Sequence, residues 1–495
     1  MQQKRWVLIC AVLASTMAFV DESVVNVALP RMEADLHTSL SAMQWVINAY
    51  TLCMSALLLI GGAAGDRFGR RRIFMIGISM FAVASVACGL APNPGALISA
   101  RALQGVGAAF LIPCGLALIS AVYDEKERGA AIGVWSGASA VAAGAGPILG
   151  GWIVDHASWR AIFLINPLLA IPALWIALRY LVESRETEIR GALDWSGALT
   201  VFLGLGAIVY GLIAAAAVGW SDVSVSGTIV AGIVLLLIFL RIERRSAAPM
   251  MALGLFKSRQ FSGVNLLTLL LYGALSGTFF FVPFLIIQVH GYSAAAAGAI
   301  FIPFAVILGA LSKWSGRLMD RFGARWPLII GPNIAAIALL LLALLSADGR
   351  YFSFIVPIVV LAFGMAITIA PLTTTVLNAV REEQTGVASG INNAAASVAG
   401  LLVIAVMGTV ALRVLDLEID AHLRRASPSA AVRHEVEAAR GGFVMPHASA
   451  QLSPAERASL REISKASFAG TIHLVLLVMA ALGFAGASVA VLMIE

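Results

Sequence analysis

Three charged residues stand inside long apolar stretches of this 495-residue chain: Asp21, Glu22 and Arg101. A charged side chain at membrane depth costs about 2.5–3.5 kcal/mol on insertion scales, so such residues usually serve a function. Burial disfavours the charged form of a carboxyl group, whereas a nearby cation favours it. Protonation and the binding of a second ligand can therefore compete at one carboxylate. The chemistry available to these residues is proton exchange coupled to ligand binding.

Helical spacing separates the two acids. Glu22 shares a face with Asn26 four residues later, and Asp21 lies about 100° away around the helix. We therefore expect only one acid to face a central cavity. Gln104 follows Arg101 by three residues and lies on the same face. A buried guanidinium group requires a carboxylate or several carbonyl oxygens as partners.

The rest of the chain explains why these charges matter. Hydrophobic residues make up 60% of the sequence and charged residues only 12%. A soluble globular protein carries about 25% charged residues, so this composition excludes a cytosolic enzyme, a disordered chain and a disulfide scaffold. The fold class predicted is an all-α polytopic membrane protein. Its net charge of +6 needs no nucleic acid, because the basic residues lie mostly in loops that face lipid headgroups.

Stretches free of Asp, Glu, Lys and Arg mark the predicted membrane helices. They run over 36–65, 73–100, 102–123, 129–154, 161–178, 195–221, 223–240, 326–347, 351–380, 384–412 and 466–494. The stretch 260–312 is split by a turn signal at 290–293, and a first segment covers 6–29. About 20 residues cross the hydrocarbon core, and each must be helical because lipid offers the backbone no partner. These stretches predict fourteen transmembrane helices.

Basic residues gather in alternate loops, and the opposite short loops hold only Arg31, Arg160 and Arg350. The positive-inside rule therefore predicts that both termini are cytoplasmic. The expected location is a bacterial-type cytoplasmic (inner) membrane. The pattern G-x-x-x-D-R-F-G-x-R at 62–71 recurs at 316–325, which indicates two homologous halves. We expect six-helix bundles over 1–190 and 259–495, an inserted helical pair over 191–258, and a long extracytoplasmic loop over 413–465.

Several motifs then resemble the major facilitator superfamily, and specifically its fourteen-helix drug:proton antiporter branch. They are the first-helix signature at 21–30, the start of the second helix at 45–50, motif A at 62–71, motif B at 101–107, motif C at 146–151 and the start of the sixth helix at 159–167. The resemblance covers most of the chain. It implies the major facilitator fold, with substrate export driven by the proton gradient and without a cofactor.

The resemblance also implies roles for individual residues. Proton coupling falls to Asp21, Glu22 and Arg101, with Asp21 favoured as the proton carrier because it matches the family position. A cytoplasmic gate that joins the two halves is expected from Asp66, Arg67, Gly69, Arg70, Asp124, Asp320 and Arg321. A kink in the fifth helix is expected from Gly146, Pro147, Gly150 and Gly151; close helix packing is the alternative reading of these four residues.

Aromatic residues suggest the substrate. An aromatic wall beside an acid suits lipophilic cations, although such aromatic side chains more often face lipid. The expected substrate cavity comprises Asn26, Tyr50, Gln104, Tyr272, Phe280 and Phe284. The sequence predicts a multidrug exporter that is no enzyme, contains no metal and acts as a monomer. A dedicated exporter of one metabolite, lipid or siderophore remains the alternative, and a non-transporting receptor or scaffold is a third reading.

Overall fold

The computed structural model describes residues 2–185, 194–246, 251, 253–345, 350–380, 385–438, 440, 443 and 452–494. Across these residues the regular structure is entirely helical, and no strand occurs in them. Apolar segments in a membrane form helices because each backbone N–H group then finds its partner within the segment. The predicted all-α membrane fold is confirmed.

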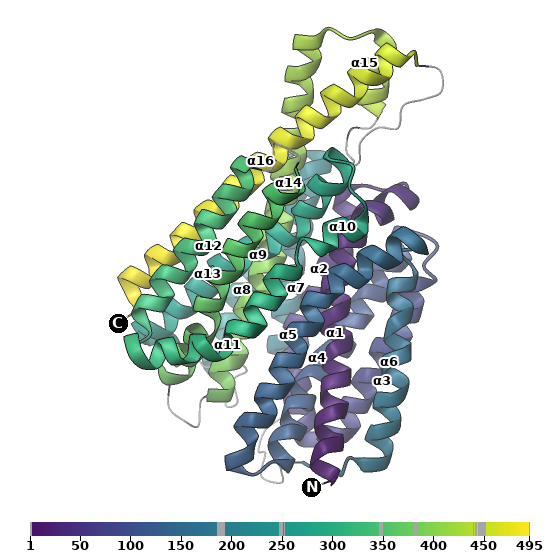
Figure 1. The fold of residues 1–495 in the computed structure, drawn as a ribbon. Helices are drawn as coiled ribbons and strands as arrows, with labels where there is room; N and C mark the ends of the chain where they lie inside the picture. The colour runs from purple at the N-terminus through teal and green to yellow at the C-terminus, as the bar shows by residue number, and fades with distance from the viewer. Residues whose placement is uncertain are drawn as a thin grey trace.

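The first bundle contains the helices α1 to α6. They are α1 (Gln2–Asp35), α2 (Leu40–Phe68), α3 (Arg70–Gly89), α4 (Pro94–Val122), α5 (Glu125–His156) and α6 (Ala161–Tyr180). Figure 1 shows these helices side by side in the half of the molecule that holds the N-terminus. An inserted pair follows, α7 (Trp195–Val218) and α8 (Val223–Arg245).

The second bundle begins after a short 3-10 helix, η1 (Leu253–Lys257). Its helices are α9 (Arg259–Phe284), α10 (Ala294–Ala299), α11 (Ile302–Phe322), α12 (Arg325–Leu345), α13 (Tyr351–Asn378), α14 (Thr385–Ala426), α15 (Ala430–Ala438) and α16 (Pro454–Met493). Helix α9 ends in a π-helical turn, η2 (Leu285–Val289), before the chain reverses. The turn predicted at 290–293 is therefore present.

Within the described residues, twelve helices are long and apolar enough to cross a membrane. The bent helix α2 raises this number to thirteen; its segments Leu40–Leu58 and Ile60–Phe68 meet at 49°. Helix α5 covers 129–154, the one predicted stretch that is not among these thirteen helices. The chain is a multi-pass membrane protein, and the count of fourteen spans stays a prediction.

The segment predicted as a long loop at 413–465 contains much helix. Helix α14 continues to Ala426, and α16 begins at Pro454 with a capping box between Ser453 and Glu456. Figure 1 shows α15 at the tip of these extended helices, beyond the rest of the bundle. The prediction took the charged residues as the ends of the membrane helices. The helices instead continue through these residues and become polar there. We call the end of the molecule that carries α15 the distal end.

The two bundles meet toward the distal end. Asp155, near the end of α5, accepts hydrogen bonds from the backbone N–H groups of Ala294 (3.0 Å) and Ala295 (2.7 Å) at the start of α10. Gln44 of α2 donates to the carbonyl oxygen of Ile404 in α14 over 2.7 Å. These side-chain-to-backbone bonds join the two bundles on the distal side of the molecule.

Helices α3 and α4 approach closely because glycine lies at their crossing. A Cβ atom at Gly107 would lie 2.7 Å from the backbone nitrogen of Phe81, and one at Gly77 would lie 2.7 Å from the backbone nitrogen of Leu111. Only glycine allows this backbone contact. The crossing brings Ser85 of α3 close to Gln104 of α4.

Replacing Gly107 by alanine should force α3 and α4 apart. We expect Gly107→Ala to cost about 1–3 kcal/mol of stability, as overpacking does, and to lower the thermal unfolding midpoint of the purified protein. Gly227→Ala on α8 is the matched control, since nothing lies within 4 Å of a Cβ atom there. Equal midpoints for Gly107→Ala and the wild type would contradict this account of the crossing.

Candidate functional site

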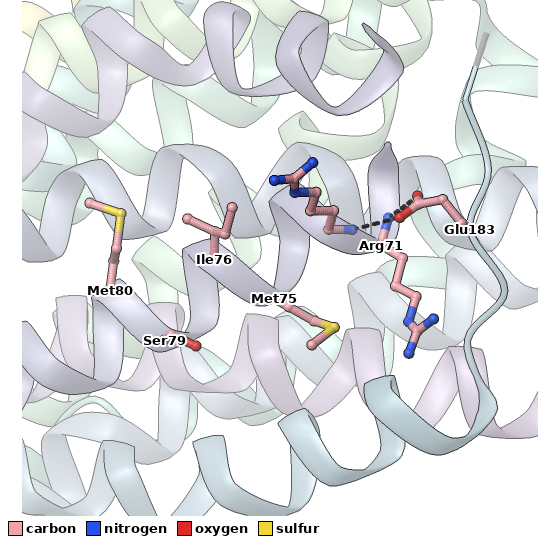
Figure 2. Close-up of a pocket in the computed structure, with 7 residues that line it drawn as sticks. Arg71, Met75, Ile76, Ser79, Met80 and Glu183 are labelled. Atoms are coloured by element: carbon pink, nitrogen blue, oxygen red, sulfur yellow. Dashed lines mark hydrogen bonds between the residues drawn. The ribbon is translucent and has the colours of Figure 1, made fainter. Parts of the chain in front are cut away.

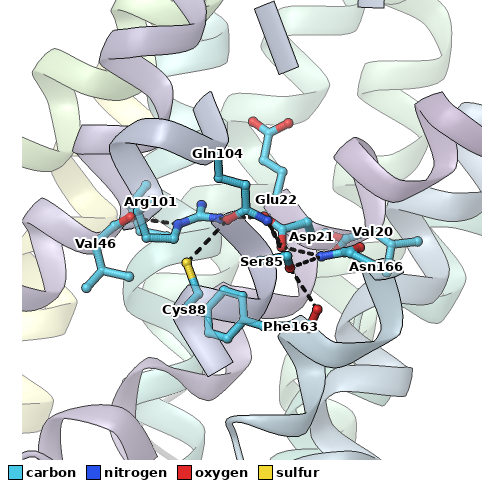
Figure 3. A network of polar contacts seen from close by, with 12 residues as sticks. Val20, Asp21, Glu22, Val46, Ser85, Cys88, Arg101, Gln104, Phe163 and Asn166 are labelled. Atoms are coloured by element: carbon cyan, nitrogen blue, oxygen red, sulfur yellow. Dashed lines mark hydrogen bonds and ion pairs between the residues drawn. The ribbon is translucent and has the colours of Figure 1, made fainter. Parts of the chain in front are cut away.

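Asp21 is the centre of a buried polar network. Its side chain is 1% exposed and forms an ion pair with Nη1 of Arg101 through Oδ2. The other oxygen, Oδ1, accepts hydrogen bonds from Gln104 Nε2 and Asn166 Nδ2, each over 2.8 Å. Figure 3 shows these side chains converging on Asp21, with Arg101 and Gln104 from α4 and Asn166 from α6. Both carboxylate oxygens are therefore engaged by donors.

Arg101 is as buried and as fully hydrogen-bonded as its partner Asp21. The side chain is 1% exposed; its Nη1 donates to Gln104 Oε1 over 2.7 Å and its Nε donates to the carbonyl oxygen of Val46 over 3.0 Å. The guanidinium carbon also lies 4.3 Å from the ring centre of Tyr50. A buried ion pair is tolerated only when further hydrogen bonds satisfy both groups. This pair meets that condition.

Ser85 and Asn166 complete the network. Asn166 Nδ2 donates to Ser85 Oγ over 2.8 Å, and Ser85 Oγ donates to the carbonyl oxygen of Phe163 over 2.7 Å. Sequence reasoning did not place either residue in the site. Asn166 belongs to the sixth-helix motif, which is a signal that could have found it. Ser85 is one of several small polar residues in apolar stretches, and nothing in its sequence context distinguishes it.

Glu22 differs from its neighbour. It is exposed where Asp21 is buried, and Figure 3 shows its carboxylate pointing away from the Asp21 network. Glu22 still lies within electrostatic range of the Arg101 guanidinium group. The Tyr50 hydroxyl is buried and has no hydrogen-bond partner within the described residues. Asn26, one turn along, donates to the backbone oxygen of Glu22 over 3.1 Å. The two acids thus point in different directions, as helical spacing predicts.

The turn between α2 and α3 holds the predicted gate residues of the first bundle. Asp66 and Arg70 form an ion pair of 2.7 Å, and the exposed Arg67 stacks on the ring of Phe68. Gly69 adopts φ = +108°, which favours glycine. A Cβ atom there would also lie 2.6 Å from the carboxyl carbon of Glu183.

Asp124 pairs with Lys4 at 2.7 Å instead of joining Asp66 and Arg70. The Lys4 ammonium group lowers the pKa of the Asp124 carboxyl group, chiefly through this hydrogen bond. This pair and the Asp66–Arg70 pair both lie inside the first bundle. The side chains of Asp320 and Arg321 lie outside the described residues. A gate that joins the two bundles at this end therefore stays a prediction.

The four residues expected to kink α5 lie at tight helix contacts. A Cβ atom at Gly146 would collide with the Ser23 hydroxyl, and one at Gly150 would collide with Val24 of α1. On the face of α5 toward the second bundle, Gly151 packs against the backbone of Ala294, and the carbonyl of Pro147 approaches Gly298. Helix α5 is thus pressed between α1 and the second bundle, which corresponds to the packing interpretation of these residues.

The residues of the predicted substrate cavity lie in two separate places. Tyr50 and Gln104 lie at the polar network. Phe280 and Phe284 are fully buried, and the ring centre of Phe284 lies 5.5 Å from that of Phe443. Tyr272 is partly buried and packs on the same hydrophobic core. Phe280 and Phe284 therefore form part of the packed interior and do not extend the network.

The fold and this network define a multi-pass membrane transporter, and known proteins specify its family. Residues 11–404 match the Major Facilitator Superfamily, and the chain belongs to that family. It is 34% identical over 429 residues to the multidrug resistance protein Stp of Mycobacterium tuberculosis (strain CDC 1551 / Oshkosh), covering 86% of this chain and 79% of that protein. It is 33% identical over 488 residues to the tetracenomycin C resistance and export protein of Streptomyces glaucescens, covering 98% of this chain and 90% of that protein.

Solved structures share the fold at low sequence identity. A bacterial homolog of the human lysosomal transporter Spinster, in an inward-facing and unoccupied conformation, superposes with a TM-score of 0.65 at 17% identity, covering 99% of this chain and 98% of that one. A POT family transporter in complex with 5-aminolevulinic acid gives a TM-score of 0.66 at 11% identity, covering 98% and 95%. The two-bundle transporter fold is thereby supported.

Removing Arg101 should destabilise the protein, because Asp21 would keep a buried and unpaired charge. We expect Arg101→Met to cost about 3–5 kcal/mol in the free energy of unfolding of the purified protein. The double variant Asp21→Asn/Arg101→Met should recover much of this loss. Arg31→Met is the control, since Arg31 belongs to an exposed ion pair with Asp35 and such pairs contribute about 0–1 kcal/mol. Additive losses in the double variant would contradict the pairing.

Proposed function

We propose that this protein exports lipophilic, positively charged drugs or antiseptics across a bacterial-type cytoplasmic membrane in exchange for protons. The observation that carries the proposal is the buried Asp21–Arg101 pair with an exposed second acid beside it. The names of the relatives, which refer to drug resistance and export, support the direction of transport. Both termini lie on the cytoplasmic side in this proposal, so the distal end faces outward.

Asp21 is the proposed proton carrier. Protonation removes its charge, and with it the ion pair that holds Arg101. The hydrogen bonds from Gln104 and Asn166 then weaken, because bonds to a charged acceptor are roughly twice as strong as neutral ones. This change occurs on α1, close to where Ser23 and Val24 pack on the glycines of α5. Protonation of Asp21 therefore alters the contacts of a helix that also packs against the second bundle.

Glu22 is the proposed counter-charge for the substrate. Glu22 is exposed, whereas the carboxylate of Asp21 is already occupied by three donors. A lipophilic cation requires both a negative charge and an aromatic or apolar surface, and the Tyr50 ring lies in the same region, beside Arg101. Assigning the substrate charge to Glu22 and the proton to Asp21 lets both acids act in one cycle.

The distal closure supports export by alternating access. The side-chain bonds from Asp155 and Gln44 close the outward side. In this state we propose that substrate enters from the cytoplasmic side. Export then requires these bonds to break while the cytoplasmic side closes.

A dedicated exporter of a single compound is the second candidate. It is favoured by relatives named for one antibiotic each, including the tetracenomycin C protein and the puromycin resistance protein pur8 of Streptomyces alboniger, which is 37% identical over 82% of this chain and 81% of that protein. A panel of unrelated lipophilic cations separates the two candidates. Transport of several of them supports the multidrug exporter.

Substrate-induced proton release from inverted membrane vesicles tests the coupling. We expect tetraphenylphosphonium to release protons through the wild type, and Asp21→Asn and Arg101→Ala to abolish the release. Asp222→Asn is the matched control, because Asp222 is an exposed carboxylate at the start of α8. Undiminished release in Asp21→Asn would remove Asp21 from the coupling. Substrate flux through the wild type that does not depend on pH would instead indicate a facilitator.

Glu22→Gln should separate charge recognition from coupling. Losing one charged contact costs about 1.5–3 kcal/mol, so we expect KM for tetraphenylphosphonium to rise roughly 10- to 100-fold. Proton release per transported molecule should be unchanged, and Glu22→Asp should restore most of the affinity. An unchanged KM in Glu22→Gln would contradict this role for Glu22.

A further inference from the structure

A groove of about 520 Å³ lies along one side of α3, away from the Asp21 network. It is lined by Arg71, Arg72, Met75, Ile76, Ser79 and Met80 of α3 and by Glu183, which follows α6. These α3 residues recur every three to four positions, so they share one face of the helix. Figure 2 shows Met75, Ile76, Ser79 and Met80 following one another along α3 from the end where Arg71 and Glu183 meet.

The groove faces out of the bundle. The other side of α3, which includes Phe74, Ile78 and Phe81, is buried, whereas Arg72, Ile76 and Ser79 are exposed. Because α3 is a membrane-spanning helix, its exposed face contacts the bilayer. The occupant of this groove must therefore come from the lipid phase.

The length and polarity of the groove match one lipid in one leaflet. Met80 lies nine positions after Arg71, which corresponds to about 14 Å along a helix. Half of the hydrocarbon core measures about 15 Å. The arginines lie at the end of α3 and the apolar side chains lie beneath them. A phospholipid has the same order, with its phosphate at the surface and its acyl chain below.

The charges at the top of the groove favour a negatively charged headgroup. The Glu183 carboxylate is already engaged by the backbone N–H groups of Arg71 (3.0 Å) and Arg72 (3.2 Å). The Arg71 guanidinium group donates to the carbonyl oxygens of Ala177 and Leu178, which fixes its position. The Arg72 guanidinium group forms no hydrogen bond or ion pair within the described part of the chain. It is therefore available to an external anion.

From these contacts we infer that the groove is a binding site for an anionic phospholipid. Its phosphate lies on Arg72 and Arg71, and one acyl chain lies along Met75, Ile76 and Met80. The flexible methionine side chains suit an acyl chain of variable conformation. A zwitterionic lipid fits the apolar part equally well, but it brings a positive headgroup charge close to Arg72. The site therefore selects by headgroup charge.

Native mass spectrometry of the full-length protein tests this inference. The protein is equilibrated in detergent with equal amounts of phosphatidylglycerol and phosphatidylcholine, and the retained lipids are counted. We expect the wild type to retain phosphatidylglycerol preferentially. Arg72→Gln should weaken this retention about fivefold, the effect of one arginine near a headgroup. Arg245→Gln is the matched control, because Arg245 is also an exposed arginine at the end of a spanning helix, α8.

A second variant separates lipid binding from simple charge attraction. Ser79→Phe fills the lower groove without changing any charge, and it should reduce phosphatidylglycerol retention, whereas Ser226→Phe at an exposed position of α8 should not. Soluble glycerol phosphate should fail to displace the lipid. Equal retention of both lipids, equal losses in Arg72→Gln and Arg245→Gln, no effect of Ser79→Phe, or displacement by glycerol phosphate would each overturn the inference.

Discussion

A charge buried in a membrane protein needs a partner, and this requirement organises the first bundle. Arg101 of α4 can remain at membrane depth because Asp21 of α1 pairs with it. The ion pair leaves other lone pairs and N–H groups of these two side chains without partners. Other helices supply the hydrogen bonds that they need. Helix α6 supplies Asn166, α3 supplies Ser85, and α2 supplies the carbonyl oxygen of Val46. One ion pair thus sets the mutual positions of five helices.

Helix α1 combines several contacts within two turns. Asp21 faces the network, Ser23 and Val24 press on the glycines of α5, and Glu22 faces outward from both. Because a helix is rigid over this length, a displacement of α1 at Asp21 also displaces Ser23 and Val24. In the proposed exchange, a change in charge at Asp21 and a change in packing against α5 are therefore parts of one event. Proximity in the sequence provides the coupling that the proposed exchange requires.

The sequence predicted the membrane fold and the turn after α9, because each depends on local composition or spacing. It also indicated that Arg101 needs a carboxylate or several carbonyl oxygens as partners. It could not place Ser85, since a serine that bonds across helices resembles any other serine in an apolar stretch. It also did not foresee the pairing of Asp124 with Lys4, which joins residues distant in the chain. The burial of Phe280 and Phe284 depends on which face of α9 turns inward, and composition does not determine that.

The helices α14 and α16 extend far beyond the hydrocarbon core. They contain 42 and 40 residues, so each is about 60 Å long, twice the thickness of the hydrocarbon core. A tilt of the second bundle about the bilayer centre moves the tips of these helices farther than it moves any residue within the membrane. Helix α15, at those tips, amplifies small rotations into large displacements in water. It is therefore the place where a spectroscopic label would report the motion of the bundle with the largest signal.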